Sequence, residues 1–168
     1  MRLKFTHAIS IIAVFIIGVA TAPRTFADAP AKDACSLLTQ AQVSDALGAA
    51  FGAGSHVTPQ FVKTCTWTPT GSAKEIKAVT LNIQTADSYD SGKKQIEMAK
   101  TAGAGEGTQL ISTSGIGDDA YYFNVGTNIT QLFFKKGTLA FKIAVYGASA
   151  DKAMAVEKTL ALEVISKL

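Results

Sequence analysis

The sequence has little of what catalytic and metal-binding sites are usually made from. Its 168 residues include two cysteines, two histidines and one tryptophan, and only 17% of the residues are charged. A typical soluble domain is about 25% charged, so the low value argues against a nucleic-acid coat or an acidic tail. No apolar run reaches the roughly 20 residues that cross a bilayer as a helix. What the chain does have is a hydrophobic fraction of 48%, which excludes a disordered chain and suits one globular domain.

The beginning of the chain has the layout of a secretory signal peptide. Arg2 and Lys4 precede an apolar stretch, and small residues follow it. This order of basic, apolar and small-residue regions is the common pattern of export signals. Cleavage fits after Ala27 or after Ala29, and the first position is preferred; the alternative is an uncleaved N-terminal anchor. We therefore expect residues 1–27 to be a signal peptide and the product to be periplasmic or extracellular.

The formal net charge of +3 belongs to this segment. Three basic residues lie in it and no acidic ones: Arg2, Lys4 and Arg24. Their removal leaves thirteen basic and thirteen acidic residues, a net charge of zero. The charge therefore gives no support to a nucleic-acid or anionic-membrane partner, and membrane contact is expected only transiently, through the signal peptide.

The two cysteines, Cys35 and Cys65, both lie in the mature chain. An even pair in an exported protein predicts a disulfide, which would close a loop of about 30 residues and stabilise the fold by roughly 3–4 kcal/mol. A metal site would need further ligands, and only His56 is available; a redox pair would usually be closely spaced. Cys35 lies too far beyond the apolar stretch, behind charged residues, to carry a lipid anchor.

Local signals predict alternating helices and strands. Thr39 and Gln42 form a capping box, which predicts a helix over 40–48 that ends at Gly48. The other expected elements are strands over 61–68 and 76–85, a helix over 88–102 capped by Asp87 or Ser88, a short strand at 110–111, strands over 120–125, 129–135 and 138–146, and a helix over 150–167 capped by Ser149.

This pattern predicts an α+β fold with the order α-β-β-α-(β)-β-β-β-α. Because hairpins and meanders connect the strands, we expect a mainly antiparallel sheet of about five strands, packed against two to three helices. Residues 28–34 are expected to be a short linker, and residues 35–168 a single domain closed by the disulfide.

The sequence offers no catalytic set. His56 lies in a Gly/Ser-flanked loop without a nucleophile motif near it, and neither cysteine is expected to be free. Asp118 and Asp119 form the most prominent acidic pair, but neighbours on an extended chain point apart and lack a calcium-loop pattern. We expect no metal and no cofactor, and favour a non-enzymatic protein. The alternative is a small hydrolase or lyase that uses Asp118, Asp119 or Glu106.

Aromatic residues are concentrated in the last three strands. If Phe134 and Phe141 face the helices, Phe133 and Tyr146 lie on the other face of the sheet and could form an exposed patch. The alternative is that a loop or the first helix covers that face. The residues predicted to form a binding surface are Trp67, Tyr122, Phe133, Tyr146, Asp118 and Asp119.

Several motifs resemble a family of small exported bacterial proteins, often lipoproteins, that is catalogued as a domain of unknown function. The similar segments are Cys35-Ser36-Leu37-Leu38-Thr39, Cys65-Thr66-Trp67, Gly115-Ile116-Gly117-Asp118-Asp119-Ala120-Tyr121 and the turn at Lys136-Gly137. The resemblance covers nearly all of the mature chain. It implies a disulfide between the two cysteines and an exported α+β domain, and it carries over no active-site residues. This chain differs from many members in lacking a lipid-attachment cysteine.

Taken together, these observations predict an exported, non-enzymatic domain that binds a protein, an envelope component or a small apolar ligand. Binding would use the sheet face or the loops around Asp118. A further alternative is a secreted inhibitor or effector, which a protruding rigid loop would favour.

Overall fold

The computed structural model describes residues 32–71, 76–103, 107–125 and 129–168. The predicted signal peptide, most of the predicted linker and Glu106 lie outside these ranges. The described helices are α1 (Gln40–Leu47), α2 (Ala86–Thr101), α3 (Ala150–Ile165) and the short 3-10 turn η1 (Ala34–Ser36). The strands are β1 (Ser55–His56), β2 (Thr64–Trp67), β3 (Ala78–Thr85), β4 (Thr108–Thr113), β5 (Asp119–Val125), β6 (Ile129–Lys136) and β7 (Leu139–Tyr146).

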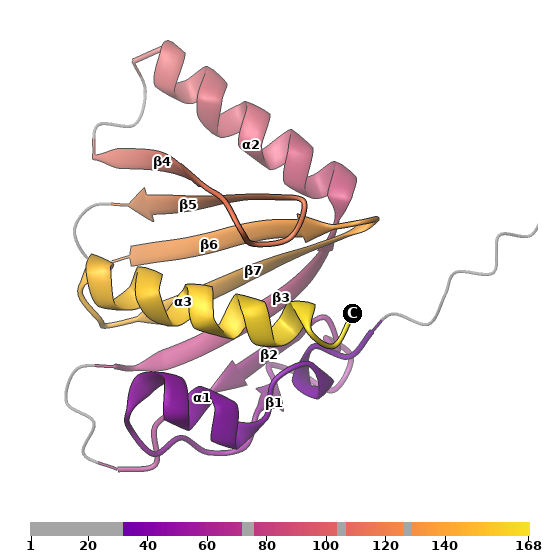
Figure 1. The fold of residues 1–168 in the computed structure, drawn as a ribbon, viewed down its shortest axis with the longest axis vertical. Helices are drawn as coiled ribbons and strands as arrows, with labels where there is room; N and C mark the ends of the chain where they lie inside the picture. The colour runs from indigo at the N-terminus through magenta and orange to yellow at the C-terminus, as the bar shows by residue number, and fades with distance from the viewer. Residues whose placement is uncertain (1–31, 72–75, 104–106, 126–128) are drawn as a thin grey trace, which may run out of the picture.

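The α+β class is confirmed, with seven strands rather than about five. All seven form one antiparallel sheet in the order β1-β2-β3-β7-β6-β5-β4. Consecutive strands are neighbours except at one place, where β3 pairs along its whole length with β7. In sequence, α2 and the strands β4 to β6 come between β3 and β7, although these two strands are neighbours in the sheet, as Figure 1 shows.

The first helix begins where its capping signal placed it. Thr39 Oγ1 accepts a hydrogen bond from the Gln42 amide at 3.2 Å, and Gln42 Oε1 accepts one from the Thr39 amide at 2.9 Å. Gly48 ends the helix in the left-handed conformation, with φ 63°. These reciprocal bonds satisfy backbone donors that a helix N-terminus otherwise leaves unpaired.

Four local predictions need correction. β1 lies inside the segment predicted to be a loop, because a two-residue strand has no period of its own and is defined by its partner, β2. β4 extends over six residues instead of two. The second helix begins at Ala86 and is capped by Thr85, whose side chain accepts from the Ser88 amide. Ser149 occupies the N-cap of α3, but its side chain makes no capping bond.

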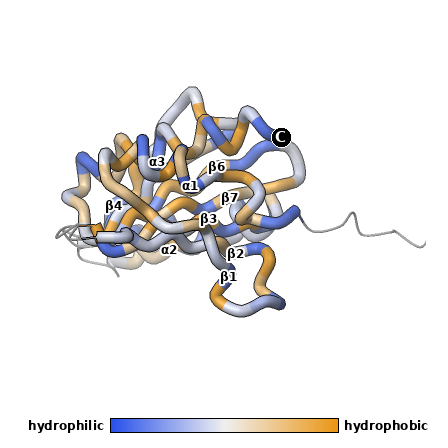
Figure 2. Tube along the Cα trace, turned by 90° about the horizontal axis from the view of Figure 1, so that it is seen from below, coloured by the Kyte–Doolittle hydropathy of each residue, from blue (hydrophilic) through white to orange (hydrophobic). Residues whose placement is uncertain are grey.

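The main hydrophobic core lies on one face of the sheet, under α1 and α3. Figures 1 and 2 show these two helices together on that face, which we call the packed face. The large side chains that are essentially inaccessible there include Leu38, Phe51, Trp67, Leu81, Leu132, Phe134, Phe141, Ile143 and Leu160. Their burial supplies most of the driving force for folding, because it removes the largest apolar areas from water.

The predicted disulfide between Cys35 and Cys65 is present. It joins η1 to β2, with Cα atoms 5.0 Å apart, and no described cysteine is free. Gly54 passes close beside it: a Cβ there would lie 2.6 Å from Cys65 Sγ and 2.7 Å from the Trp67 ring, so only glycine fits. A disulfide is typical of an oxidising, non-cytoplasmic compartment.

None of the helices in the described part of the chain is long and apolar enough to span a bilayer.

Candidate functional site

The other face of the sheet is only partly covered, and we call it the open face. Figure 2 shows α2 on this side, opposite α1 and α3. The register places Tyr121 opposite Phe133, Phe133 opposite Lys142, and Lys142 opposite Asn82. Directly opposite residues of an antiparallel pair share a face, so these four side chains form one row across four strands. α2 covers the aromatic end of the row and leaves the polar end accessible.

Aromatic contacts attach α2 to the sheet. Tyr89 of α2 is 1% exposed and lies 5.2 Å, centroid to centroid, from Tyr121. Tyr121 in turn stacks on Phe133 at 5.0 Å, with an interplanar angle of 9°. With Ala140, the two tyrosines form a second small core that is separate from the main one.

Charged groups beside these rings also attach α2 to the sheet. Asp119 Oδ2 accepts hydrogen bonds from the Tyr89 hydroxyl at 2.9 Å and from Lys93 Nζ at 2.8 Å. Lys135 Nζ pairs with Asp90 at 2.7 Å. Burial opposes the ionisation of Asp119, but the bonds from Lys93 and Tyr89 outweigh it and lower the pKa of this carboxyl. Burial, and then the Asp119 bond, raise the pKa of Tyr89 far above its ordinary value.

A groove runs along the open face beside α2. Its accessible volume is about 500 Å³, which lies within the range of roughly 300–1,000 Å³ typical of small-molecule sites. Its lining residues come from the end of the β1–β2 connection, from β3, from α2 and from the aromatic floor: Lys63, Ile83, Gln84, Thr85, Ser88, Tyr89, Gly92, Tyr121 and Phe133. No carboxylate, histidine or cysteine is among them.

The acidic pair at the start of β5, Asp118 just before the strand and Asp119 its first residue, does not make a catalytic dyad. Asp118 binds Lys136 Nζ at 2.8 Å and the Gly137 amide at 2.7 Å, whereas Asp119 faces Tyr89 and Lys93. The bonds from Lys136 and Gly137 lower the pKa of Asp118. The two carboxylates therefore bind different partners, and neither lines the groove.

The predicted aromatic surface is divided between the two faces. Trp67 is fully buried and Tyr122 is 4% exposed, and the Tyr122 hydroxyl donates to the Met154 carbonyl at 3.0 Å. Neither side chain is available to a ligand. Phe133 and Tyr146 are half-buried and share the open face, but the Gln131–Ala144 pair separates their rows.

The connection between β1 and β2 projects from the open face, as Figure 2 shows. Its apolar side chains include Val57, which is 72% exposed, and Phe61, which is 63% exposed. The backbone is nevertheless held, because the Phe61 amide donates to the Thr58 carbonyl at 2.9 Å and the Ala34 amide donates to the Val62 carbonyl at 2.8 Å. A loop was predicted over residues 52–60, but its projection and the exposure of Val57 and Phe61 were not, because exposure depends on the tertiary fold.

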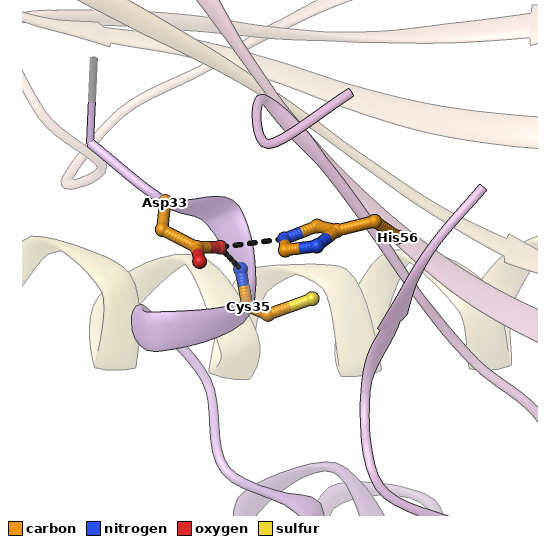
Figure 3. Close-up of side chains that lie close together, drawn as sticks. All are labelled: Asp33, Cys35 and His56. Atoms are coloured by element: carbon orange, nitrogen blue, oxygen red, sulfur yellow. Dashed lines mark hydrogen bonds and ion pairs between the residues drawn. The ribbon is translucent and has the colours of Figure 1, made fainter. Parts of the chain in front are cut away.

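A third feature is a cluster of polar side chains beside the disulfide, shown in Figure 3. Asp33 Oδ1 lies 2.8 Å from His56 Nε2 and accepts a 2.7 Å hydrogen bond from the Cys35 amide. The hydrogen bond from His56 lowers the pKa of Asp33. The sequence predicted a linker at Asp33 and an isolated loop at His56, since the two residues are 23 positions apart and carry no local sign of contact.

No known protein family, curated protein or solved structure matches this chain.

Proposed function

We propose that the chain is an exported binding domain without catalytic activity, and that the groove beside α2 is its ligand site. The observation that carries this proposal is the groove itself, a hollow of about 500 Å³ on a face that the helices leave partly open. Export is supported by the signal-like N-terminus and by the disulfide.

The lining indicates the chemistry of the ligand. Phe133, which is half-buried and held by its stack on the buried Tyr121, offers an apolar surface on which a ring can pack, at a favourable free energy of about 0.5–1.5 kcal/mol beyond burial. Gln84 offers an amide and Lys63 a cationic group at the edge. These groups suit a small amphipathic molecule that carries an aromatic or apolar ring and an anionic substituent.

The same lining argues against catalysis. General acid–base and nucleophilic mechanisms need a titratable or nucleophilic group within hydrogen-bond reach of the reacting atoms. Besides Lys63, the titratable side chains of the groove are two tyrosines, and burial raises the pKa of Tyr121 to about 12. A phenol that stays protonated at neutral pH is a poor base.

Filling the groove tests the proposal without damaging the fold. The probe is anilinonaphthalene sulfonate, which combines aromatic rings with an anionic group and becomes fluorescent in apolar sites. A Cβ on Gly92 meets nothing within 4 Å, so Gly92→Leu places a side chain in the groove and also favours the helix. We expect at least tenfold weaker binding of the probe to this variant, with no loss in the free energy of unfolding.

The matched control is Leu162→Ala, which removes a side chain that is 46% exposed on α3. It should leave the affinity for the probe unchanged. Equal binding to the wild type and to Gly92→Leu would show that the groove is not the site, and no binding to either would remove the proposed ligand class.

The β1–β2 loop favours a second candidate function, that of a secreted inhibitor or effector. A rigid loop that presents an exposed Phe61 binds with little loss of conformational entropy, which is how preorganised loops gain affinity. The test is titration of a chymotrypsin-like and a subtilisin-like protease with the protein. An inhibitor would act stoichiometrically, and Phe61→Ala would abolish the effect; full protease activity at excess protein would reject this function for both classes.

A further inference from the structure

Four side chains of kinds that can ligate metals meet where η1 packs on β2 and Asp33, the cap of η1, contacts His56 of β1. Asp33 caps η1, and Cys35 lies within it. His56 and Cys65 are opposite each other in the β1–β2 register, so their side chains share a face. Asp33 carboxylate, Cys35 Sγ and His56 ring nitrogen atoms lie within 4.8 Å of one another. We call these four residues the donor cluster: Asp33, Cys35, His56 and Cys65.

We propose that the donor cluster binds one Zn²⁺ ion when its disulfide is reduced. A dithiol reductant supplies the two electrons and two protons that convert the S–S bond into two thiols, and is itself oxidised to a disulfide. Zn²⁺ then replaces the two thiol protons, which pass to solvent. Every electron and proton is accounted for by the reductant and the metal.

The donor set matches what zinc prefers. One imidazole, one carboxylate and two thiolates complete a tetrahedral site, with bonds of about 2.0–2.3 Å and donor atoms roughly 3.3–3.8 Å apart. The donor atoms of Asp33, Cys35 and His56 are within about 1 Å of that spacing, a gap that side-chain rotation can close. The side chains of His56 and Asp33 are 23% and 45% exposed, which leaves a path for the ion from solvent.

The scaffold holds the donors in two short, local pairs. Asp33 and Cys35 are two residues apart, and the hydrogen bond that the Cys35 amide donates to Asp33 Oδ1 fixes their relative position. His56 and Cys65 are fixed by the β-ladder. The oxidised protein keeps the carboxylate and the imidazole but has no thiolate, so the disulfide and the metal exclude each other. The cluster thus becomes a redox-dependent metal site, separate from the groove.

The test is an anaerobic titration of the full chain with Co²⁺ and with Zn²⁺, before and after reduction by a phosphine. We expect the reduced protein to bind one equivalent of Co²⁺ and to show a thiolate-to-cobalt charge-transfer band that Zn²⁺ abolishes. The oxidised protein should show no such band. His56→Ala should weaken Zn²⁺ binding at least tenfold and alter the ligand-field bands, whereas Ser55→Ala, its exposed neighbour on β1, should do neither.

The reduced chain can unfold, so circular dichroism is recorded alongside. If it unfolds, one equivalent of Zn²⁺ should restore the native spectrum, because a metal that binds only the folded state stabilises it. The proposal is overturned if the folded, reduced protein shows no charge-transfer band, if Zn²⁺ fails to refold an unfolded chain, or if His56→Ala binds Zn²⁺ as tightly as the wild type. That last result would indicate adventitious binding by the two thiolates.

Discussion

The two faces of the sheet are built from the same strands but differ in how completely helices cover them. On the packed face, α1 and α3 cover the sheet, and Phe134 and Phe141 stack at 5.0 Å with no exposed surface. On the open face α2 covers one end only, and Phe133, the neighbour of Phe134 in sequence, stays half-buried. One residue along a strand therefore separates a core position from a groove position.

This difference shows how the molecule divides its tasks. The packed face carries the apolar burial that stabilises the fold, and the open face keeps aromatic and polar groups accessible beside a groove. Stability and binding are therefore expected to respond to different substitutions.

The strongest test of this division compares two adjacent phenylalanines. Phe134→Ala should lower the free energy of unfolding by about 3–5 kcal/mol, because it leaves a cavity in a fully buried site. Phe133→Ala should cost only about 1–1.5 kcal/mol, mainly the stack on Tyr121. Urea unfolding of both variants measures the difference. Equal losses would mean that the open face is as well packed as the other.

The next largest effect is expected at the disulfide. Replacing both Cys35 and Cys65 by alanine should cost about 3–4 kcal/mol, because the unfolded chain regains the freedom of a loop with a sequence separation of 30. The groove contains neither cysteine, so probe binding should persist at temperatures where the variant is folded. Thermal unfolding and the fluorescence titration together check this; a lost groove would show that the disulfide shapes both faces.

Glu157 is the exception on the packed face, and pH tests it. The side chain is fully buried on α3; its Oε1 accepts from the Val145 amide at 3.0 Å, and its Oε2 has no partner among the described residues. Burial raises its pKa from 4.5 to about 9. The folded state therefore holds a proton that the unfolded state releases, and stability falls as the pH rises between these values, by at most about 1.4 kcal/mol per pH unit.

Glu157→Gln removes this titration and keeps the acceptor for Val145. The free energy of unfolding should then stay level between pH 5 and pH 9, and exceed that of the wild type by up to about 3 kcal/mol at pH 7. Urea unfolding at pH 5, 7 and 9 is the measurement. Glu97→Gln changes an exposed residue of α2, so this control should keep the wild-type decrease in the free energy of unfolding with rising pH. If the free energy of unfolding of Glu157→Gln falls with pH as steeply as that of the wild type, another group causes the pH dependence.

The sequence predicted what local physics determines. The capping box at Thr39 and Gln42 and the α+β class are confirmed, because both follow from local patterns; the Cys35–Cys65 disulfide is confirmed too, because the chain has only these two cysteines to pair. The alternation of the strands also placed Phe134 and Phe133 on opposite faces, as the structure has them. The pairing of β3 with β7 and the coverage by α2 could not be predicted, since the first joins residues more than fifty positions apart and the second depends on contacts such as Tyr89–Asp119, 30 positions apart. For the same reason Trp67 and Tyr122 were placed on a surface, although both are buried.

The smallest predicted effect is also the most direct measure of free space on the open face. Gly92→Ala should raise the free energy of unfolding by about 0.5–1 kcal/mol, because alanine favours a helix interior and its Cβ meets nothing within 4 Å. Gly54→Ala is the matched change in the packed region, where a Cβ would meet Cys65 Sγ at 2.6 Å, and it should destabilise the fold. Urea unfolding of the two variants should give opposite signs. The same sign for both would mean that the open face has no room for an added methyl group, and hence no groove for a ligand.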